Sequence, residues 1–342
     1  MNVENEITLY VHIGYGKTGS SSIQKTLKRN GDFLKNNAAF YIGLMGELLP
    51  GEKYSWQIPF GWGRLLKLGE TGIKELKAML LDNMRILKDE GVEKVIWSNE
   101  SFLKSPLIVI DILKFLKENG VNIQVIAYVR RHDAWARSAY LQWGLKHKTY
   151  RGKVKSFKEW VKSNTPDFYG YLSQWVELDW GNTVVRNFDC VENVTDDFIQ
   201  LLDLKGDYLN CRDNDTPSST ALYLWALYNN QYERQVLPGE LYGFLVSHGI
   251  IGTHINELDY CSLFPSANDL EEVVKNSERD RVQVNSVLRE QGQEALSDIP
   301  LEEKNYNVTQ SQINAVFLNV IKKQQEEIAS IKEILLRNNI SI

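Results

Sequence analysis

The chain has 342 residues, a hydrophobic content of 43% and a net charge of −5. This length suffices for one large α/β domain or two smaller ones. The acidic balance argues against a nucleic-acid binder, which usually carries an excess of positive charge. The three cysteines form no metal-binding or disulfide pattern, which favours a reducing, cytoplasmic location. No secretory leader and no run of about 20 apolar residues is apparent, so we expect no transmembrane segment.

Strands and helices are expected to alternate over residues 7–204. Short apolar runs predict buried strands, and apolar residues that recur every three or four positions predict helices. The expected strands are residues 7–13, 92–98, 121–129 and 183–188. The expected helices are residues 20–29, 72–89, 106–119, 133–147, 156–163, 167–178 and 196–204. This alternation predicts an α/β fold in which helices flank a parallel sheet.

The remainder of the chain is expected to be mostly helical, with helices over residues 217–230, 269–291 and 309–337. Apolar residues in the last helix fall near heptad spacing, but Gln324 interrupts them, which favours packing on the parent domain over a coiled-coil dimer. We therefore expect one domain over residues 1–342. Its nucleotide-binding core spans residues 1–205, and a helical extension of residues 206–342 packs on that core. The oligomeric state stays open.

A glycine-rich turn follows the first strand and reads Gly14-Tyr-Gly-Lys17-Thr-Gly19-Ser20-Ser21-Ser22. Because a helix begins at the serines, backbone N–H groups and hydroxyls gather at a helix N-terminus, which favours an anion such as phosphate. Gly16-Lys17-Thr18 matches the end of the nucleoside-triphosphatase loop. The glycine expected six residues before the lysine is absent, since Val11 stands there. The turn is therefore P-loop-like but compact, and it suits a single 5′-phosphate-linked group better than a triphosphate.

A second basic segment follows the third expected strand and reads Tyr128-Val-Arg130-Arg131-His132-Asp133. Ligands of open parallel sheets bind beyond the carboxyl ends of the strands, so Arg130 is expected at the same edge as Lys17. Ser138 lies eight residues later, on the following helix, and could hold one phosphate together with Arg130. The alternative is a basic helix start with solvated arginines. Cations are unfavourable near a helix N-terminus unless an anion binds there.

Together these segments resemble the sulfotransferases that use 3′-phosphoadenosine 5′-phosphosulfate (PAPS), and among them the bacterial carbohydrate type. The glycine-rich turn resembles their 5′-phosphosulfate loop, and Arg130 with Ser138 resembles their 3′-phosphate motif. The resemblance extends from residue 7 to about residue 205, and the stretch 214–218 is also similar. The family often has proline where this chain has His132, a change that alters the stiffness of the turn but removes no binding group.

The resemblance implies metal-independent, in-line transfer of a sulfuryl group from PAPS to a hydroxyl or amine of a carbohydrate. The expected acceptor is a bacterial surface polysaccharide or glycolipid, and the nucleotide product is adenosine 3′,5′-bisphosphate (PAP). Lys17 would stabilise the departing nucleotide, and Glu100, which follows the second expected strand, would take the acceptor's proton. The residues expected to bind the nucleotide are Gly16, Lys17, Thr18, Gly19, Ser20, Ser21, Ser22, Arg130 and Ser138.

Several of these roles have alternatives. Glu100 could instead cap the next helix, and His12 is a rival base, although its place inside the first strand is typical of a core histidine. The side chains that could contact the acceptor are His12, Trp56, Trp62, His132 and His147. The two tryptophans could equally cover the core. Two other functions remain open: a nucleotide or small-molecule kinase that uses magnesium and ATP, and a nucleotide-binding module without catalysis.

Overall fold

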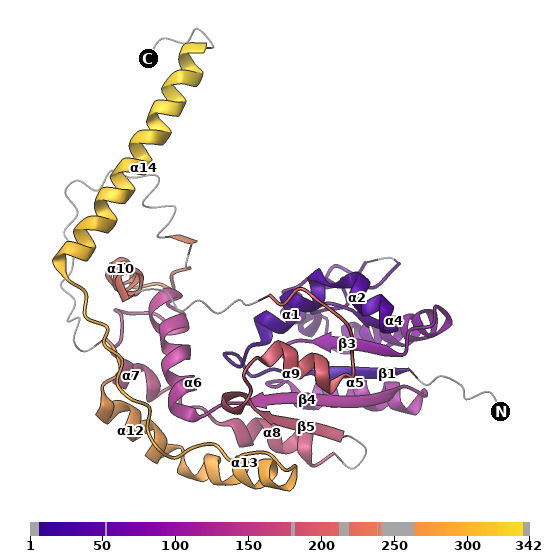
Figure 1. Cartoon of the computed structure of the whole chain (residues 1–342). Coiled ribbons are helices and arrows are strands. Elements are labelled where there is room, and N and C mark those ends of the chain that lie inside the picture. The colour runs from indigo at the N-terminus through magenta and orange to yellow at the C-terminus, as the bar shows by residue number, and fades with distance from the viewer. Residues whose placement is uncertain are drawn as a thin grey trace. The chain divides into compact units, whose positions relative to one another are not determined.

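The computed structural model describes residues 7–51, 53–178, 182–211, 219–237, 239–240 and 263–337. The stretch 214–218, which resembles sulfotransferases in sequence, lies outside these residues. The chain divides into two compact units (Figure 1). Unit 1 consists of Met1–Trp135, Pro166–Asp215 and Val274–Ile299, and unit 2 consists of Ala136–Thr165, Thr216–Val273 and Pro300–Ile342. Each unit therefore contains segments that are distant in sequence.

Unit 1 contains a five-stranded parallel sheet with the strand order β2-β3-β1-β4-β5. The strands are β1 (Thr8–His12), β2 (Ala39–Tyr41), β3 (Lys94–Ser98), β4 (Asn122–Val129) and β5 (Asn182–Asn187). The central strand β1 pairs with both neighbours, so that Val11 lies between Trp97 and Val125. The four predicted strands and the parallel α/β fold are confirmed. The edge strand β2 was not predicted, because three residues are too few to show a periodic pattern.

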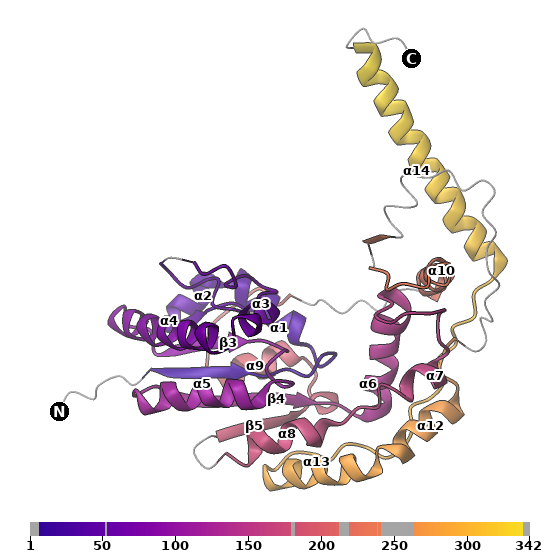
Figure 2. The same ribbon diagram turned by 180° about the vertical axis from the view of Figure 1, so that it is seen from behind.

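Helices cover both faces of this sheet (Figure 2). The helices of unit 1 are α1 (Ser20–Arg29), α2 (Gly31–Asn36), α3 (Trp62–Lys67), α4 (Gly69–Asp89), α5 (Pro106–Glu118), α8 (Phe168–Val176), α9 (Val194–Leu201) and α13 (Glu278–Glu290), with a 3-10 turn η2 (Phe188–Cys190). Side chains of α1, α2 and α9 form one core cluster with residues of β2, β3 and β4. Helices α4, α5 and α8 lie on the opposite face. The turns that precede α1, α6 (His132–Ala139) and η2 therefore lie at the edge where the strands end.

Unit 2 is helical in the part that the structure describes. Its elements are the π-helix η1 (Tyr140–Lys146), α7 (Phe157–Val161), α10 (Ser219–Asn229), most of α12 (Ala267–Asn276) and α14 (Gln310–Arg337). Both α7 and α10 pack on η1, where the buried Tyr140 ring contacts Phe157 and Trp160. Helix α6 (His132–Ala139) belongs to unit 1 up to Trp135 and to unit 2 after it.

The structure refines two predicted helices. The expected helix 133–147 begins as α6 and continues as η1, so its second half is a π-helix rather than an α-helix. The expected helix 269–291 is two helices, α12 and α13, separated at Ser277, whose side chain is buried. Among the helices of the described residues, none combines the length and the apolar character needed to cross a membrane.

Candidate functional site

The turn between β1 and α1 is held in place by hydrogen bonds to its own backbone. The Thr18 hydroxyl donates to the carbonyl oxygen of Tyr15 at 2.5 Å, and the Thr18 N–H donates to the same oxygen at 3.2 Å. The indole N–H of Trp135 donates to the carbonyl oxygen of Gly16 at 2.8 Å. No side chain caps the start of α1. The positive end of that helix is therefore presented by a turn whose conformation is firmly set.

Two residues of this turn adopt left-handed backbone conformations. Lys17 has a φ of 73° and Gly19 a φ of 86°. A non-glycine residue in this region costs about 1–2 kcal/mol, and such conformations cluster at ligand-binding sites. Gly19 is also sterically required, because a Cβ atom there would lie 2.5 Å from a methyl group of Val194. The sequence placed glycine where the turn needs it, but only the structure shows the strain at Lys17.

Two buried polar atoms meet beside Gly14. The Ser20 hydroxyl oxygen and the Nε2 atom of His12 are both buried, and neither has a hydrogen-bond partner of ordinary geometry among the described residues. A Cβ atom at Gly14 would lie 2.4 Å from Ser20 Oγ and 3.3 Å from His12 Nε2. Buried polar groups are normally satisfied, so such atoms indicate a place for a ligand or an ordered water. They lie directly at the N-terminus of α1.

Glu100 lies two residues beyond the end of β3 and carries a perturbed pKa. Its side chain is exposed, yet the protein that surrounds it desolvates the carboxylate and raises its pKa. The hydroxyl of Ser20 and the ammonium of Lys17 oppose this effect and lower the pKa in part. Three predicted site residues from two distant segments therefore interact electrostatically. A carboxylate with a raised pKa at the edge of a sheet is typical of catalytic acids and bases.

Arg130, at the end of β4, reaches the same turn. One Nη atom of its guanidinium donates to the carbonyl oxygen of Lys17 at 3.3 Å, and its Nε donates to Asp189 at 3.3 Å. The guanidinium also lies over the ring of Phe188, 5.0 Å from its centroid. The structure thus brings Arg130 to the predicted phosphate loop. Its side chain is about one quarter exposed, so solvent still reaches the guanidinium.

Asp189 was not identified from the sequence. Its carboxylate also accepts a hydrogen bond of 2.6 Å from the backbone N–H of Arg131, so it orients the whole segment that follows β4. Asp189 lies just after β5, the next strand of the sheet. The sequence signal that could have identified Asp189 is its position directly after a predicted strand. Arg130 and Glu100 were identified from similar positions.

Ser21, Ser22 and Ser138, which are also predicted to bind the nucleotide, differ in how far they are buried. Ser21 is exposed and Ser22 is buried on the first turn of α1. Ser138 is half-buried on α6 and belongs to unit 2, whereas Arg130 belongs to unit 1. The joint action of Arg130 and Ser138 on one phosphate stays a prediction.

His12 is a fully buried residue of the central strand. Its Nδ1 atom lies 2.8 Å from the Ser98 hydroxyl, and burial lowers its pKa to about 3. Its ring contacts those of Tyr128 and Phe198. The imidazole is therefore neutral at physiological pH. As a base, it would act only through the Nε2 atom that lies beside Gly14 and Ser20.

His132 is buried at the start of α6 and forms a contact with Asp280 of α13. The Nε2 atom lies 2.5 Å from the Asp280 carboxylate, which also accepts hydrogen bonds from the backbone N–H groups of Phe168 and Tyr169. The carboxylate therefore occupies the N-terminus of α8 and links three helices of unit 1. This arrangement gives His132 a structural role where the sulfotransferases often have proline. Its predicted contact with an acceptor stays a prediction.

The remaining acceptor candidates lie apart from the loop in sequence and carry internal contacts. Trp56 is buried, stacks on Tyr54 and donates its indole N–H to Glu75. Trp62 is buried and donates to the Ser105 hydroxyl at 3.2 Å. These contacts match the alternative in which both indoles cover the core. His147 is half-buried at the end of η1 in unit 2.

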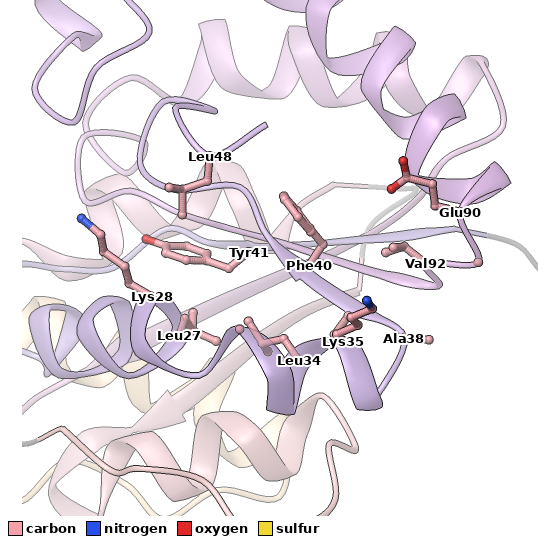
Figure 3. A pocket seen from close by; sticks show the side chains of 13 residues that line it. Leu27, Lys28, Leu34, Lys35, Ala38, Phe40, Tyr41, Leu48, Glu90 and Val92 are labelled. Carbon is pink, nitrogen blue, oxygen red and sulfur yellow. The ribbon is translucent and has the colours of Figure 1, made fainter. Parts of the chain in front are cut away.

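A separate apolar cavity of about 620 Å³ lies against the edge strand β2. Figure 3 shows Phe40 and Tyr41 of β2 with Leu34 of α2 and Leu48, while Lys28, Lys35 and Glu90 lie at its margin. None of the predicted site residues lines this cavity. It is therefore a different feature from the turn at the N-terminus of α1.

Comparisons with known proteins found no matching protein-family model and no matching curated protein. Within the described ranges, no group of three or more histidine, cysteine, aspartate and glutamate side chains is arranged to hold a metal ion. The residues at the carboxyl edge of the sheet, where Lys17, Glu100 and Arg130 lie, are therefore the features of this chain that indicate a function.

Proposed function

We propose that the chain is a PAPS-dependent sulfotransferase with a carbohydrate acceptor. The observation that carries the proposal is the convergence of Lys17, Ser20, Arg130 and Glu100 at the carboxyl edge of one parallel sheet. Two cationic side chains, a helix N-terminus without a side-chain cap and the buried hydroxyl of Ser20 form a site for an anion. The carboxylate of Glu100 supplies a proton acceptor beside it.

Each residue would contribute a distinct part of the reaction. The N-terminus of α1 and the hydroxyl of Ser20 would hold the 5′-phosphate of the nucleotide. Arg130 would hold the 3′-phosphate that distinguishes PAPS from ATP. As the bond between sulfur and the acceptor oxygen forms, the bond between sulfur and the bridging phosphate oxygen breaks. Lys17 would neutralise the charge that develops on that departing oxygen.

Glu100 would receive the proton that the acceptor hydroxyl or amine loses. Its raised pKa makes it a stronger base than an ordinary glutamate, once it is ionised. The ammonium of Lys17 lowers the pKa of Glu100 and so favours the ionised form that the reaction requires. Desolvation and the neighbouring cation thus act in opposite directions on the same carboxylate.

Thermal unfolding with added nucleotides tests this proposal. We expect PAP without magnesium to raise the melting temperature and ATP with magnesium to have little effect. The opposite result would favour the kinase alternative, which requires a metal and a triphosphate. Stabilisation by PAP without sulfate transfer to any acceptor would favour the non-catalytic module. Transfer from labelled PAPS to a panel of polysaccharides and glycolipids would identify the acceptor.

A further inference from the structure

The long helix α14 carries an apolar stripe that the described part of the molecule leaves exposed. Phe317, Ile321, Ile328 and Ile331 are 39%, 49%, 52% and 55% exposed. Among the described helices of unit 2, none packs extensively along α14. The sequence alone favours packing of this helix on the parent domain, and the assembly proposed below is the alternative to that prediction. An isolated helix in water gains little stability without burial of its apolar face, so this stripe requires a partner.

The spacing of the stripe specifies the kind of partner. Phe317, Ile321, Ile328, Ile331 and Leu335 follow each other at intervals of four, seven, three and four residues. These intervals place Ile321, Ile328 and Leu335 at a positions and Phe317 and Ile331 at d positions of a heptad repeat. A stripe with this repeat fits the same stripe on another helix of the same length. The surface therefore matches further copies of itself.

Charges beside the stripe are complementary in a parallel arrangement. In this register Glu327 is a g position and Lys332 is the e position five residues later. In a parallel coiled coil, a g residue of one helix faces the following e residue of the next helix. Glu327 of each copy would therefore face Lys332 of another copy. On the outer face, Glu333 pairs with Arg337 of its own helix at 3.6 Å.

A membrane surface fits the helix less well. Helices that lie on lipid usually carry a strongly basic polar face. Residues 310–337 contain four basic and three acidic side chains, so the helix is nearly neutral. The charges also alternate in sign, as expected for a helix that pairs with another helix.

We propose that α14 assembles in parallel with α14 of other copies of this chain as a coiled coil. Isoleucine at both a and d positions favours three or more strands over two. Gln324 at a d position and Asn314 at an a position would be polar residues in the core and help to set the register. The proposal concerns α14 alone and does not depend on the proposed sulfotransferase activity.

Sedimentation equilibrium of the full chain tests this assembly. We expect a mass of three chains at micromolar concentration, and a single chain for the double variant Ile321→Asp/Ile328→Asp. The control variant Ala329→Asp/Ser330→Asp adds the same charge to the outer face and should keep the assembled mass. A single-chain mass for the unmodified protein, or an assembly that survives Ile321→Asp/Ile328→Asp, would overturn the proposal. Thermal unfolding would verify that both variants remain folded.

A charge exchange tests the pairing across copies. Glu327→Lys and Lys332→Glu should each raise the dissociation constant of the assembly about tenfold, and the double exchange should restore it. Failure of the double exchange to restore assembly would contradict the pairing of these two residues across a parallel interface.

A cysteine substitution tests the direction of the helices. Asn314→Cys places a thiol at an a position near the start of α14, and a positions at the same end meet only in a parallel assembly. In an antiparallel pair, the two substituted residues would lie about 30 Å apart. Chains with Asn314→Cys that fail to cross-link on oxidation would contradict a parallel coiled coil. Flotation with anionic vesicles by a monomeric protein would show a lipid surface as the partner instead.

Discussion

The guanidinium of Arg130 donates a 3.3 Å hydrogen bond to the backbone carbonyl oxygen of Lys17. This contact joins the end of β4 to the turn that follows β1, two neighbouring strands of the sheet. It places a fixed cation beside the N-terminus of α1. A ligand with two phosphates could therefore contact the turn and the arginine at once, and this is the physical basis of the proposed specificity for PAPS.

Loss of the arginine should weaken nucleotide binding. We expect Arg130→Ala to raise the dissociation constant for PAP about 10- to 100-fold, since a charge-assisted hydrogen bond contributes about 1.5–3 kcal/mol. Arg130→Lys should recover only part of the affinity, because lysine lacks the planar fork of donors. Isothermal titration calorimetry measures both. Arg29→Ala removes an exposed cation from the other end of α1 and should bind PAP normally.

Lys17 combines a proposed catalytic role with a strained backbone. Both Lys17→Ala and Lys17→Gly should abolish sulfuryl transfer, because both remove the ammonium. Lys17→Gly should nevertheless be the more stable variant by about 1 kcal/mol, since glycine adopts a φ of 73° without a steric penalty. Urea unfolding of the two variants measures the difference. Equal stability of the two variants would mean that the backbone of the turn is not strained at this residue.

Gly19 should tolerate no side chain. Gly19→Ala should reduce the free energy of unfolding by about 2–4 kcal/mol, because it combines an unfavourable φ with an overlap against Val194. Gly120 has the same φ of 86° but open space around its Cα. Gly120→Ala is therefore the matched control and should cost about 1 kcal/mol. If both substitutions cost the same, the contact with Val194 is not what requires glycine.

The proposed base predicts a particular pH dependence of the transfer rate. Glu100 must be ionised to accept a proton, so the rate should fall as the pH decreases through its pKa. Desolvation places that pKa above the ordinary glutamate value of 4.5. Glu100→Gln should lower kcat about 100-fold, remove this acid limb and leave PAP binding intact. Glu90→Gln changes an exposed carboxylate at the other end of β3 and should leave the profile unchanged. An acid limb that persists in Glu100→Gln would assign the base elsewhere.

Burial of His12 predicts a loss of stability in acid. Its pKa is about 3 in the folded chain and 6.5 as an ordinary value. Between these values the unfolded chain binds a proton that the folded chain does not, so stability decreases as the pH falls. The contribution is about 1.4 kcal/mol per pH unit within that window and vanishes above it. His12→Asn should reduce the slope by this amount, and an unchanged slope would mean that His12 does not cause the loss of stability. Chemical denaturation at several pH values measures the slopes.

Local patterns sufficed for much of the fold. Apolar runs identified four of the five strands. Because ligands of open parallel sheets bind beyond the carboxyl ends of the strands, the sequence also indicated Lys17, Glu100 and Arg130 as site residues. These features depend on residues close together in the chain, where periodicity and turn chemistry act directly. The short strand β2 and the break between α12 and α13 at Ser277 could not be predicted in this way, because neither shows a periodic arrangement of apolar residues.

The sequence by itself determined the parallel α/β fold and the position of a glycine-rich turn at a helix start. Only the tertiary structure decided which groups meet there. The contact of Arg130 with Lys17 joins residues 113 positions apart, and that of His132 with Asp280 joins residues 148 positions apart. The desolvation of Glu100 and His12 likewise depends on the protein that surrounds them. Burial and contacts between distant segments arise only when the chain is folded, so no local pattern contains them.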